Sequence, residues 1–151
     1  MGIKRYENII KQANRIVNES DVAYVSVLDE DGYPHVATRS PRNARGIFSC
    51  YFTTGTSGNM AAAVTNNRKA SVCFQKGNDN ITLIGDFEII TDKKTKEDVW
   101  VDWFIDHYPG GVDDPNYFVM KFITKRVSLW VDRNTAAFDI RDIDKALTTR
   151  I

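Results

Sequence analysis

The chain has 151 residues, of which 42% are apolar and 26% are charged, as in an ordinary globular domain. Lysine plus arginine number 20, and aspartate plus glutamate also number 20, so no net charge attracts a nucleic acid or an acidic membrane. Charges are scattered through the N-terminal segment, which excludes a signal peptide or a membrane span there and makes the cytoplasm the expected location.

The first third of the chain predicts one helix followed by three strands. Apolar residues recur at steps of three and four, which predicts an amphipathic helix over about residues 3–18. Residues 21–29 alternate as a strand does, and Asp31-Gly32 favours a hairpin into the next strand. A calcium loop is disfavoured there, because the later EF-hand ligands are missing. "GIFSCYFTT", residues 46–54, predicts the third strand.

A short helix and two strands are predicted in the middle of the chain. The helix covers about residues 60–67, and Ser57 is the expected N-terminal cap. The strands cover residues 69–75 and 81–91, with Gly85 at a predicted bulge.

The last third predicts a helix, two strands and a final helix. Thr95 and Asp98 form a capping signal, and one helical face carries the apolar and aromatic residues Val99, Trp100, Trp103, Phe104 and His107. Pro109 to Gly111 should end this helix. Residues 117–124 and 126–132 predict two strands that pair antiparallel. Helical spacing in the tail involves Ala136, Ile140, Ile143 and Leu147.

Short antiparallel strands with few helices predict a mainly β (α+β) fold, a small barrel or a sandwich. No linker or repeat divides the chain, so residues 1–151 are expected to form a single domain. Cys50 and Cys73 lie far apart in apolar runs and are interpreted as reduced core residues.

The sequence lacks the common catalytic motifs of hydrolases, metalloproteases and nucleotide-binding proteins. His35 and His107 have no second histidine or cysteine at metal-ligand spacing, so no metal site is expected. Asp102, Asp106 and His107 could meet a metal in principle, but a solvated helix face is the favoured interpretation.

Small hydroxyl residues and glycines gather where the third strand meets the short helix. Thr53, Thr54, Thr56 and Ser57 could hold a phosphate, because short hydroxyl groups and the first N–H groups of a helix bind anions. A tight turn with a serine cap fits the same residues. The local pattern leaves both interpretations open.

A resemblance to a known family extends over about residues 5–132 and leaves the tail, residues 133–151, outside. It rests on the order of the segments "DEDGYPHV", "YFTTGTSGNM", "TNNRKASVCF", "ITLIGDFEII" and "YPGGVDDPNYFVMKFITKRVSLW". In this order the chain resembles the FMN-binding split β-barrels related to pyridoxamine 5′-phosphate oxidase, and most of all their general stress protein branch.

The resemblance implies a homodimer of six-stranded antiparallel split β-barrels with flanking helices, and FMN in a cleft between the subunits. The strand from Val36 to Pro41 would line the flavin with backbone groups. The expected cofactor-binding residues are Thr38, Arg39, Phe52, Thr53, Thr54, Ser57, Gly58, Asn59, Asn80 and Trp130. Ser57 to Asn59 fall on the phosphate motif, Asn80 near the flavin ring, and Trp130 in a strand that closes the cleft.

The chain departs from the family at three positions that are often basic, which here are Ala37, Gly58 and Asn59. Arg39 lies on the same side of its strand as Ala37, so it is expected to restore one charge; Arg68 or Lys69 could add another.

The expected function is that of an FMN-dependent oxidoreductase acting on an unknown small molecule, with no side chain needed as an acid or base. The alternatives are a non-catalytic flavin-binding stress protein, or a deazaflavin- or haem-binding member of the fold with His35 as the first haem ligand. Oxidation of a pyridoxal precursor is disfavoured, because Asp102, Trp103 and Asp106 do not form a second phosphate site. The abundant aromatic residues independently favour a dimer.

Overall fold

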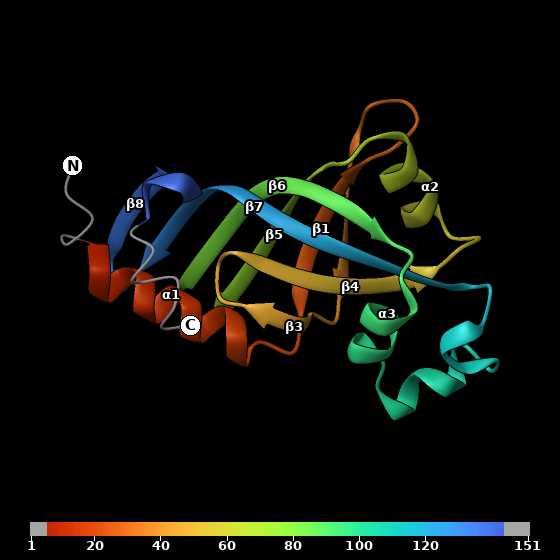
Figure 1. Cartoon of the computed structure of the whole chain (residues 1–151). Coiled ribbons are helices and arrows are strands. Elements are labelled where there is room, and N and C mark those ends of the chain that lie inside the picture. Colours follow the sequence, from red (N-terminus) through yellow and green to blue (C-terminus); the bar gives the residue numbers. More distant parts are fainter. Residues whose placement is uncertain (1–5, 144–151) are drawn as a thin grey trace.

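The computed structural model describes residues 6–143 as one curled antiparallel sheet with helices at its two ends (Figure 1). Its α-helices are α1 (Glu7–Glu19), α2 (Asn59–Asn66) and α3 (Lys93–Val99). Its strands are β1 (Ala23–Leu28), β2 (Pro34–Arg39), β3 (Arg42–Arg45), β4 (Ser49–Gly55), β5 (Lys69–Lys76), β6 (Asp79–Ile90), β7 (Tyr117–Val131) and β8 (Asn134–Asp139). Three 3₁₀ helices are η2 (Asp102–Asp106), η3 (Gly111–Asp113) and η4 (Ile140–Asp142). The mainly β, split-barrel fold is therefore confirmed, with eight strands in the sheet rather than six.

The order of the strands explains the curl of the sheet. The path runs β2-β1-β5-β6-β7-β4-β3, and β8 pairs with β7 beyond β4. Only Ser40 and Pro41 separate β2 from β3, although these strands lie at opposite ends of the path. The sheet must therefore bend back until its two ends approach each other.

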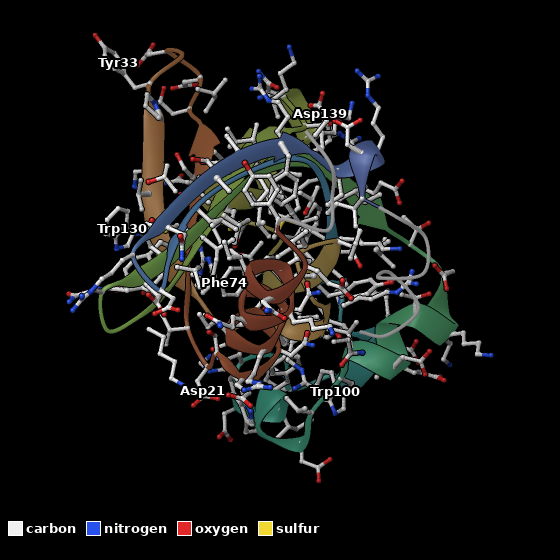
Figure 2. All side chains as sticks on the ribbon, turned by 90° about the vertical axis from the view of Figure 1, so that its left-hand side faces the viewer. Asp21, Tyr33, Phe74, Trp100, Trp130 and Asp139 are labelled. Carbon is white, nitrogen blue, oxygen red and sulfur yellow. The ribbon has the colours of Figure 1, made fainter. Side chains whose placement is uncertain are left out.

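The inside of this curl is apolar. Phe52, Phe74, Phe87 and Phe122 are fully buried, and Figure 2 shows Phe74 among the interior side chains. Helix α1 covers one end and contributes the buried residues of its apolar face, from Ile10 to Val17. Burial of such side chains contributes about 1.5–3 kcal/mol each, which is the main source of stability.

Helix α1 is also tied to the turn between β3 and β4 by two asparagine side chains. The Oδ1 atom of Asn14 accepts from the N–H of Ile47 at 2.9 Å, and that of Asn18 accepts from the N–H of Gly46 at 2.8 Å. Strand β3, which the sequence did not predict, is thereby fixed against the helix.

Both cysteines are free, but they differ in environment. Cys50 is buried, and burial raises the pKa of its thiol to about 12. Cys73 is only half-buried, because it lies on the outward face of β5 opposite Tyr24 and Thr82. The interpretation as core residues holds for Cys50 alone.

Several sequence-based predictions of local structure are wrong. First, Ser57 does not cap α2. Gly58 occupies the N-cap position without a side-chain hydrogen bond, so Ser57 lies one residue too early. The backbone N–H of Ser57 instead donates a hydrogen bond to Oδ1 of Asn116 at 3.4 Å.

Second, residues 95–107 do not form one helix. Helix α3 starts after Asp92, whose carboxylate accepts a hydrogen bond from the N–H of Thr95 at 2.9 Å. The helix ends at Val99, because the next residue, Trp100, has an extended backbone conformation. A separate 3₁₀ helix, η2, follows. The predicted single helical face is therefore divided, although Trp100 and Phe104 still pack edge to face at 5.5 Å between ring centroids.

Third, the predicted pair of strands at 117–124 and 126–132 is the single strand β7. It pairs with β6 along its length, so the chain has no reason to turn at Lys125. The turn comes later, where Asp132 and Arg133 both have positive φ, and the chain returns as β8 rather than as a helix. Leu147 of the predicted last helix lies outside the described residues.

The predicted bulge at Gly85 is confirmed by a register shift between β6 and β7 at Ile84 and Gly85. A Cβ atom at Gly85 would lie 2.0 Å from the carbonyl oxygen of Ile123, closer than any real contact. The bulge thus requires glycine because of close backbone approach.

We expect Gly85→Ala to lower the free energy of unfolding by roughly 3 kcal/mol, because two paired backbones must separate. Chemical denaturation of the variant measures this loss. Glu88→Ala, an exposed position of the same strand, is the control and should stay within about 0.5 kcal/mol of wild type. A Gly85→Ala protein as stable as this control would contradict the steric account.

Candidate functional site

A cleft of about 430 Å³ opens where the end of β2 meets the end of β4. Its third side is the segment that contains η2. The lining residues are Val22, Thr38, Arg39, Ser40, Thr53, Thr54, Gly55, Trp103, Phe104, His107, Tyr108 and Asn116. Among residues 6–143, no aspartate or glutamate belongs to this lining, and Arg39 is its one permanently charged side chain.

Arg39 is the guanidinium of the cleft. It lies on the inward side of β2 together with Ala37, as the alternation of the strand predicted, and both residues are half-buried. Its Nε atom donates to Sδ of Met60 at 3.1 Å, which places the side chain against the first turn of α2. Arg39 therefore brings its positive charge to the helix terminus where Gly58 and Asn59 bring none.

The side chains of Trp103, Phe104, His107 and Tyr108 form what we call the aromatic wall of the cleft. The Trp103 ring packs edge to face on Phe104 at 4.6 Å and on His107 at 5.8 Å. Phe104 is buried, yet Trp103 remains 52% exposed. An indole ring that packs on neighbouring aromatic side chains and keeps one part exposed to solvent can stack on a planar ligand.

Two tyrosines connect this wall to the barrel. Burial raises the pKa of Tyr108, although a hydrogen bond with the Thr53 side chain opposes the increase. Behind Tyr108 lies Tyr117, with ring centroids 5.0 Å apart. Burial, reinforced by the nearby Tyr108, raises the pKa of Tyr117 to about 12. Both phenols remain protonated at neutral pH and can donate hydrogen bonds.

The loop after β4 has fewer free donors than a phosphate cradle requires. The N–H of Thr56 donates to the carbonyl oxygen of Asn116 at 3.0 Å, and its hydroxyl donates to that of Pro115 at 2.8 Å. The N–H of Gly58 donates to Gly55 at 2.9 Å. The donors that face the cleft come instead from the ends of β2 and β4.

The structure brings together only part of the predicted cofactor set. Thr38, Arg39, Thr53 and Thr54 meet in the cleft. Phe52 is in the core, and its side chain does not reach the cleft. The remaining predicted residues, Ser57, Gly58, Asn59, Asn80 and Trp130, do not line it.

These remaining residues occupy two other places. Asn59 lines a separate hollow of about 720 Å³ beside the β1–β2 hairpin, together with His35. Asn80 and Trp130 are cross-strand neighbours of β6 and β7. Trp130 is 42% exposed and projects outward from the sheet in Figure 2.

Seven residues that line the cleft were not predicted to bind a cofactor, namely Val22, Gly55, Trp103, Phe104, His107, Tyr108 and Asn116. Tyr108 was close to the recognised aromatic residues but outside their assumed helical spacing. Asn116 had no local signal of a place in the cleft, because its contacts with the loop after β4 are to the distant residues Thr56 and Ser57.

Among residues 6–143, no cluster of three or more histidine, cysteine, aspartate or glutamate side chains is placed to hold a metal ion. Within the same range, each helix is too short or too polar to cross a membrane.

The family model described as "Pyridoxamine 5′-phosphate oxidase like" matches residues 10–150. The chain belongs to this family. No protein among the curated sequences matches it.

Solved structures with the family fold agree. A Clostridium acetobutylicum protein related to general stress protein 26 of B. subtilis is 27% identical, with a TM-score of 0.81 over 91% of this chain and 99% of that one. General stress protein 26 from Bacillus anthracis is 18% identical, with a TM-score of 0.74 over 88% of this chain and 99% of that one. A haem binding protein from Mycobacterium smegmatis is 14% identical, with a TM-score of 0.72 over 88% of this chain and 58% of that one.

The donor set of the cleft fits the flavin cofactor that this family fold suggests. A phosphate ester requires a cation and short donors, which Arg39, Thr38 and Thr53 provide. A planar ring requires an open aromatic or backbone surface, which the aromatic wall and the free edge of β2 provide. A carboxylate would repel the phosphate, and none from the described part of the chain lines the cleft.

We expect stability to fall between about pH 10 and pH 12, because the folded state holds Tyr117 protonated above the ordinary pKa of 10.0. Its contribution is fully present below pH 10 and is lost as the pH rises through the folded value of about 12. Tyr117→Phe should be less stable at pH 8 but should lose less stability over this interval. Denaturation at several pH values measures both effects, and equal slopes for variant and wild type would contradict the assignment.

Proposed function

We propose that the protein binds FMN in this cleft and acts as a flavin-dependent oxidoreductase on a planar small molecule. The observation that carries the proposal is a cleft in which no carboxylate of the described chain takes part, with Arg39 at one side and an open aromatic wall at the other. Bound flavin would supply the hydride or electron transfer. The protein would then bind, orient and shield the reactants.

The anionic end of the cofactor is assigned to the Arg39 side. The guanidinium lies at the first turn of α2, where backbone N–H groups lack helical partners and carry a partial positive charge. The hydroxyls of Thr38 and Thr53 add donors from two strands. One cation and these neutral donors would replace the basic residues absent at positions 37, 58 and 59.

The flavin ring is assigned to the aromatic wall, and the planar substrate would stack on the open face of that ring. Trp103 offers its exposed ring, and Phe104 and His107 restrict its motion. Asp102 and Asp106 flank Trp103 in sequence but do not line the cleft, so they do not create a site for a cationic substrate. A neutral or anionic aromatic compound matches this surface best.

We propose further that a second copy of the chain covers the outer face of the sheet. A cross-strand row on this face contains Thr38, Tyr24, Cys73, Thr82, Ser128 and Ala137, and none of these side chains is charged. Exposed apolar neighbours include Val36 at 59% and Trp130 at 42%. Because Thr38 also lines the cleft, a second copy here would cover the open side of the cofactor site.

A non-catalytic flavin-binding protein is the alternative within the same cleft. Turnover distinguishes the two functions. The bound flavin is reduced with a nicotinamide nucleotide, and planar acceptors such as quinones or nitroaromatic compounds are then added. Reoxidation faster than by dissolved oxygen supports the oxidoreductase. Reoxidation at the oxygen rate with every acceptor supports the non-catalytic function.

Haem binding is a second candidate, because the cleft contains an imidazole. That imidazole belongs to His107, whereas His35 lines the separate hollow. A haem titration that gives a Soret shift lost in His107→Gln, together with no FMN binding, would favour haem over flavin.

We expect wild type to bind FMN more tightly than riboflavin, because only FMN has the phosphate that Arg39 would contact. Arg39→Ala should lower the affinity for FMN by tenfold or more, since hydrogen bonds to charged groups contribute about 1.5–3 kcal/mol. Riboflavin affinity should change little. Flavin fluorescence titration measures all four constants.

The control for this titration is Arg45→Ala, which removes an exposed arginine from β3 outside the cleft. It should leave both affinities unchanged. If Arg39→Ala keeps the full preference for FMN over riboflavin, the phosphate assignment is wrong.

We expect Thr82→Lys to prevent dimer formation, because it places a charge in the middle of the uncharged row. Light scattering at micromolar concentration should give the dimer mass for wild type and the monomer mass for the variant. The control is Glu88→Lys, which changes the charge of the same strand at an exposed position outside the uncharged row. This variant should remain dimeric. A monomeric wild type would refute the proposed interface.

A further inference from the structure

All four carbonyl groups at the C-terminal end of α3 have hydrogen-bond donors. An α-helix leaves its last four carbonyls without helical partners, and in α3 these belong to Lys96, Glu97, Asp98 and Val99. The donors are, in that order, the Tyr117 hydroxyl at 2.9 Å, the Trp100 N–H at 3.1 Å, Nδ2 of Asn43 at 3.0 Å and Nε of Arg42 at 3.2 Å. Three of the four donors are side chains from distant strands.

Two consecutive residues of β3 provide half of this arrangement, and we call Arg42 and Asn43 the α3 clamp. Arg42 places a cation at the negative end of the helix dipole. Asn43 has a φ of 47°, a left-handed conformation that asparagine tolerates better than most residues. The left-handed backbone and the hydrogen bond from the side-chain amide to the Asp98 carbonyl oxygen are thus both properties of Asn43.

The clamp holds the segment that carries the aromatic wall. After the clamped carbonyl of Val99 the chain turns, and Trp103 follows within η2. The far end of the wall is fixed separately, because the Asp114 carboxylate accepts from the N–H groups of Gly110 and Asn116, both at 2.9 Å. Without the clamp, the beginning of the wall would lose two of its connections to the barrel.

The clamp also belongs to the same stretch of chain as Arg39. Only Ser40 and Pro41 separate Arg39 in the cleft from Arg42 in the clamp. We propose that Arg42 and Asn43 are positioning residues, which fix the distance between the aromatic wall and the Arg39 side of the cleft. Arg42 does not line the cleft, so it acts through the wall rather than through contact with a ligand.

The test uses the whole protein with both interactions removed, Arg42→Met with Asn43→Gly. Methionine keeps an unbranched apolar stem, and glycine keeps the left-handed backbone. In the protein without flavin, we expect amide hydrogen exchange over residues 100–108 to become at least tenfold faster. Exchange in β5, on the far side of the sheet path, should remain unchanged.

The binding part of the test rests on the proposed function. Loosening of the wall should lower the affinities for FMN and for riboflavin by the same factor, about tenfold. The two factors should be equal because the phosphate of FMN would keep its contact with Arg39. Arg39→Ala should instead weaken FMN selectively. Arg42→Lys, which retains a cation and a donor, should recover most of the lost affinity, and Arg45→Ala should match wild type.

Three results would overturn the proposal. Unchanged exchange over 100–108 would show that the clamp does not hold the wall. Faster exchange throughout the sheet would indicate a general loss of stability. A loss of FMN affinity without a loss for riboflavin would make Arg42 a phosphate ligand. If wild type binds neither flavin, the proposed function fails, but the exchange measurement still decides the role of the clamp.

Discussion

The two-residue connection between β2 and β3 is the constraint on which the site depends. It joins strands from opposite ends of the sheet path and so brings the end of β2 beside β4. Thr38 and Arg39 then face Thr53 and Thr54 across one cleft. Directly after the connection, Arg42 and Asn43 bind the end of α3. The Arg39 side and the aromatic wall of the cleft are therefore both positioned by one short stretch of chain.

The electrostatics of the cleft differ from those of the whole chain. The chain is neutral overall, yet of the side chains between residues 6 and 143 no carboxylate and one guanidinium line the cleft. Basic side chains are absent at Gly58 and Asn59, and in the loop before them the N–H and the hydroxyl of Thr56 donate to Asn116 and Pro115. Recognition of an anion therefore depends on Arg39, which reaches the first turn of α2 from a different strand. A single charge next to a helix terminus can do this where water is partly excluded.

Local patterns predicted the elements whose structure is decided locally. The two-residue alternation gave the inward position of Arg39, and the lone glycine in a long strand predicted the bulge at Gly85. Long-range contacts decided the rest. Helix α3 ends where side chains from β3 and β7 bind its carbonyls, and β7 continues because β6 pairs with it past Lys125. Nothing near Asn116 in sequence indicates its contact with the loop after β4.

A crystal structure of the protein with added FMN tests the central claim most directly. The account predicts the phosphate within hydrogen-bond distance of the Arg39 guanidinium and the flavin ring between the end of β2 and the aromatic wall. FMN bound elsewhere, for example in the hollow lined by His35 and Asn59, would contradict it. So would a cleft that stays empty in crystals grown with saturating FMN.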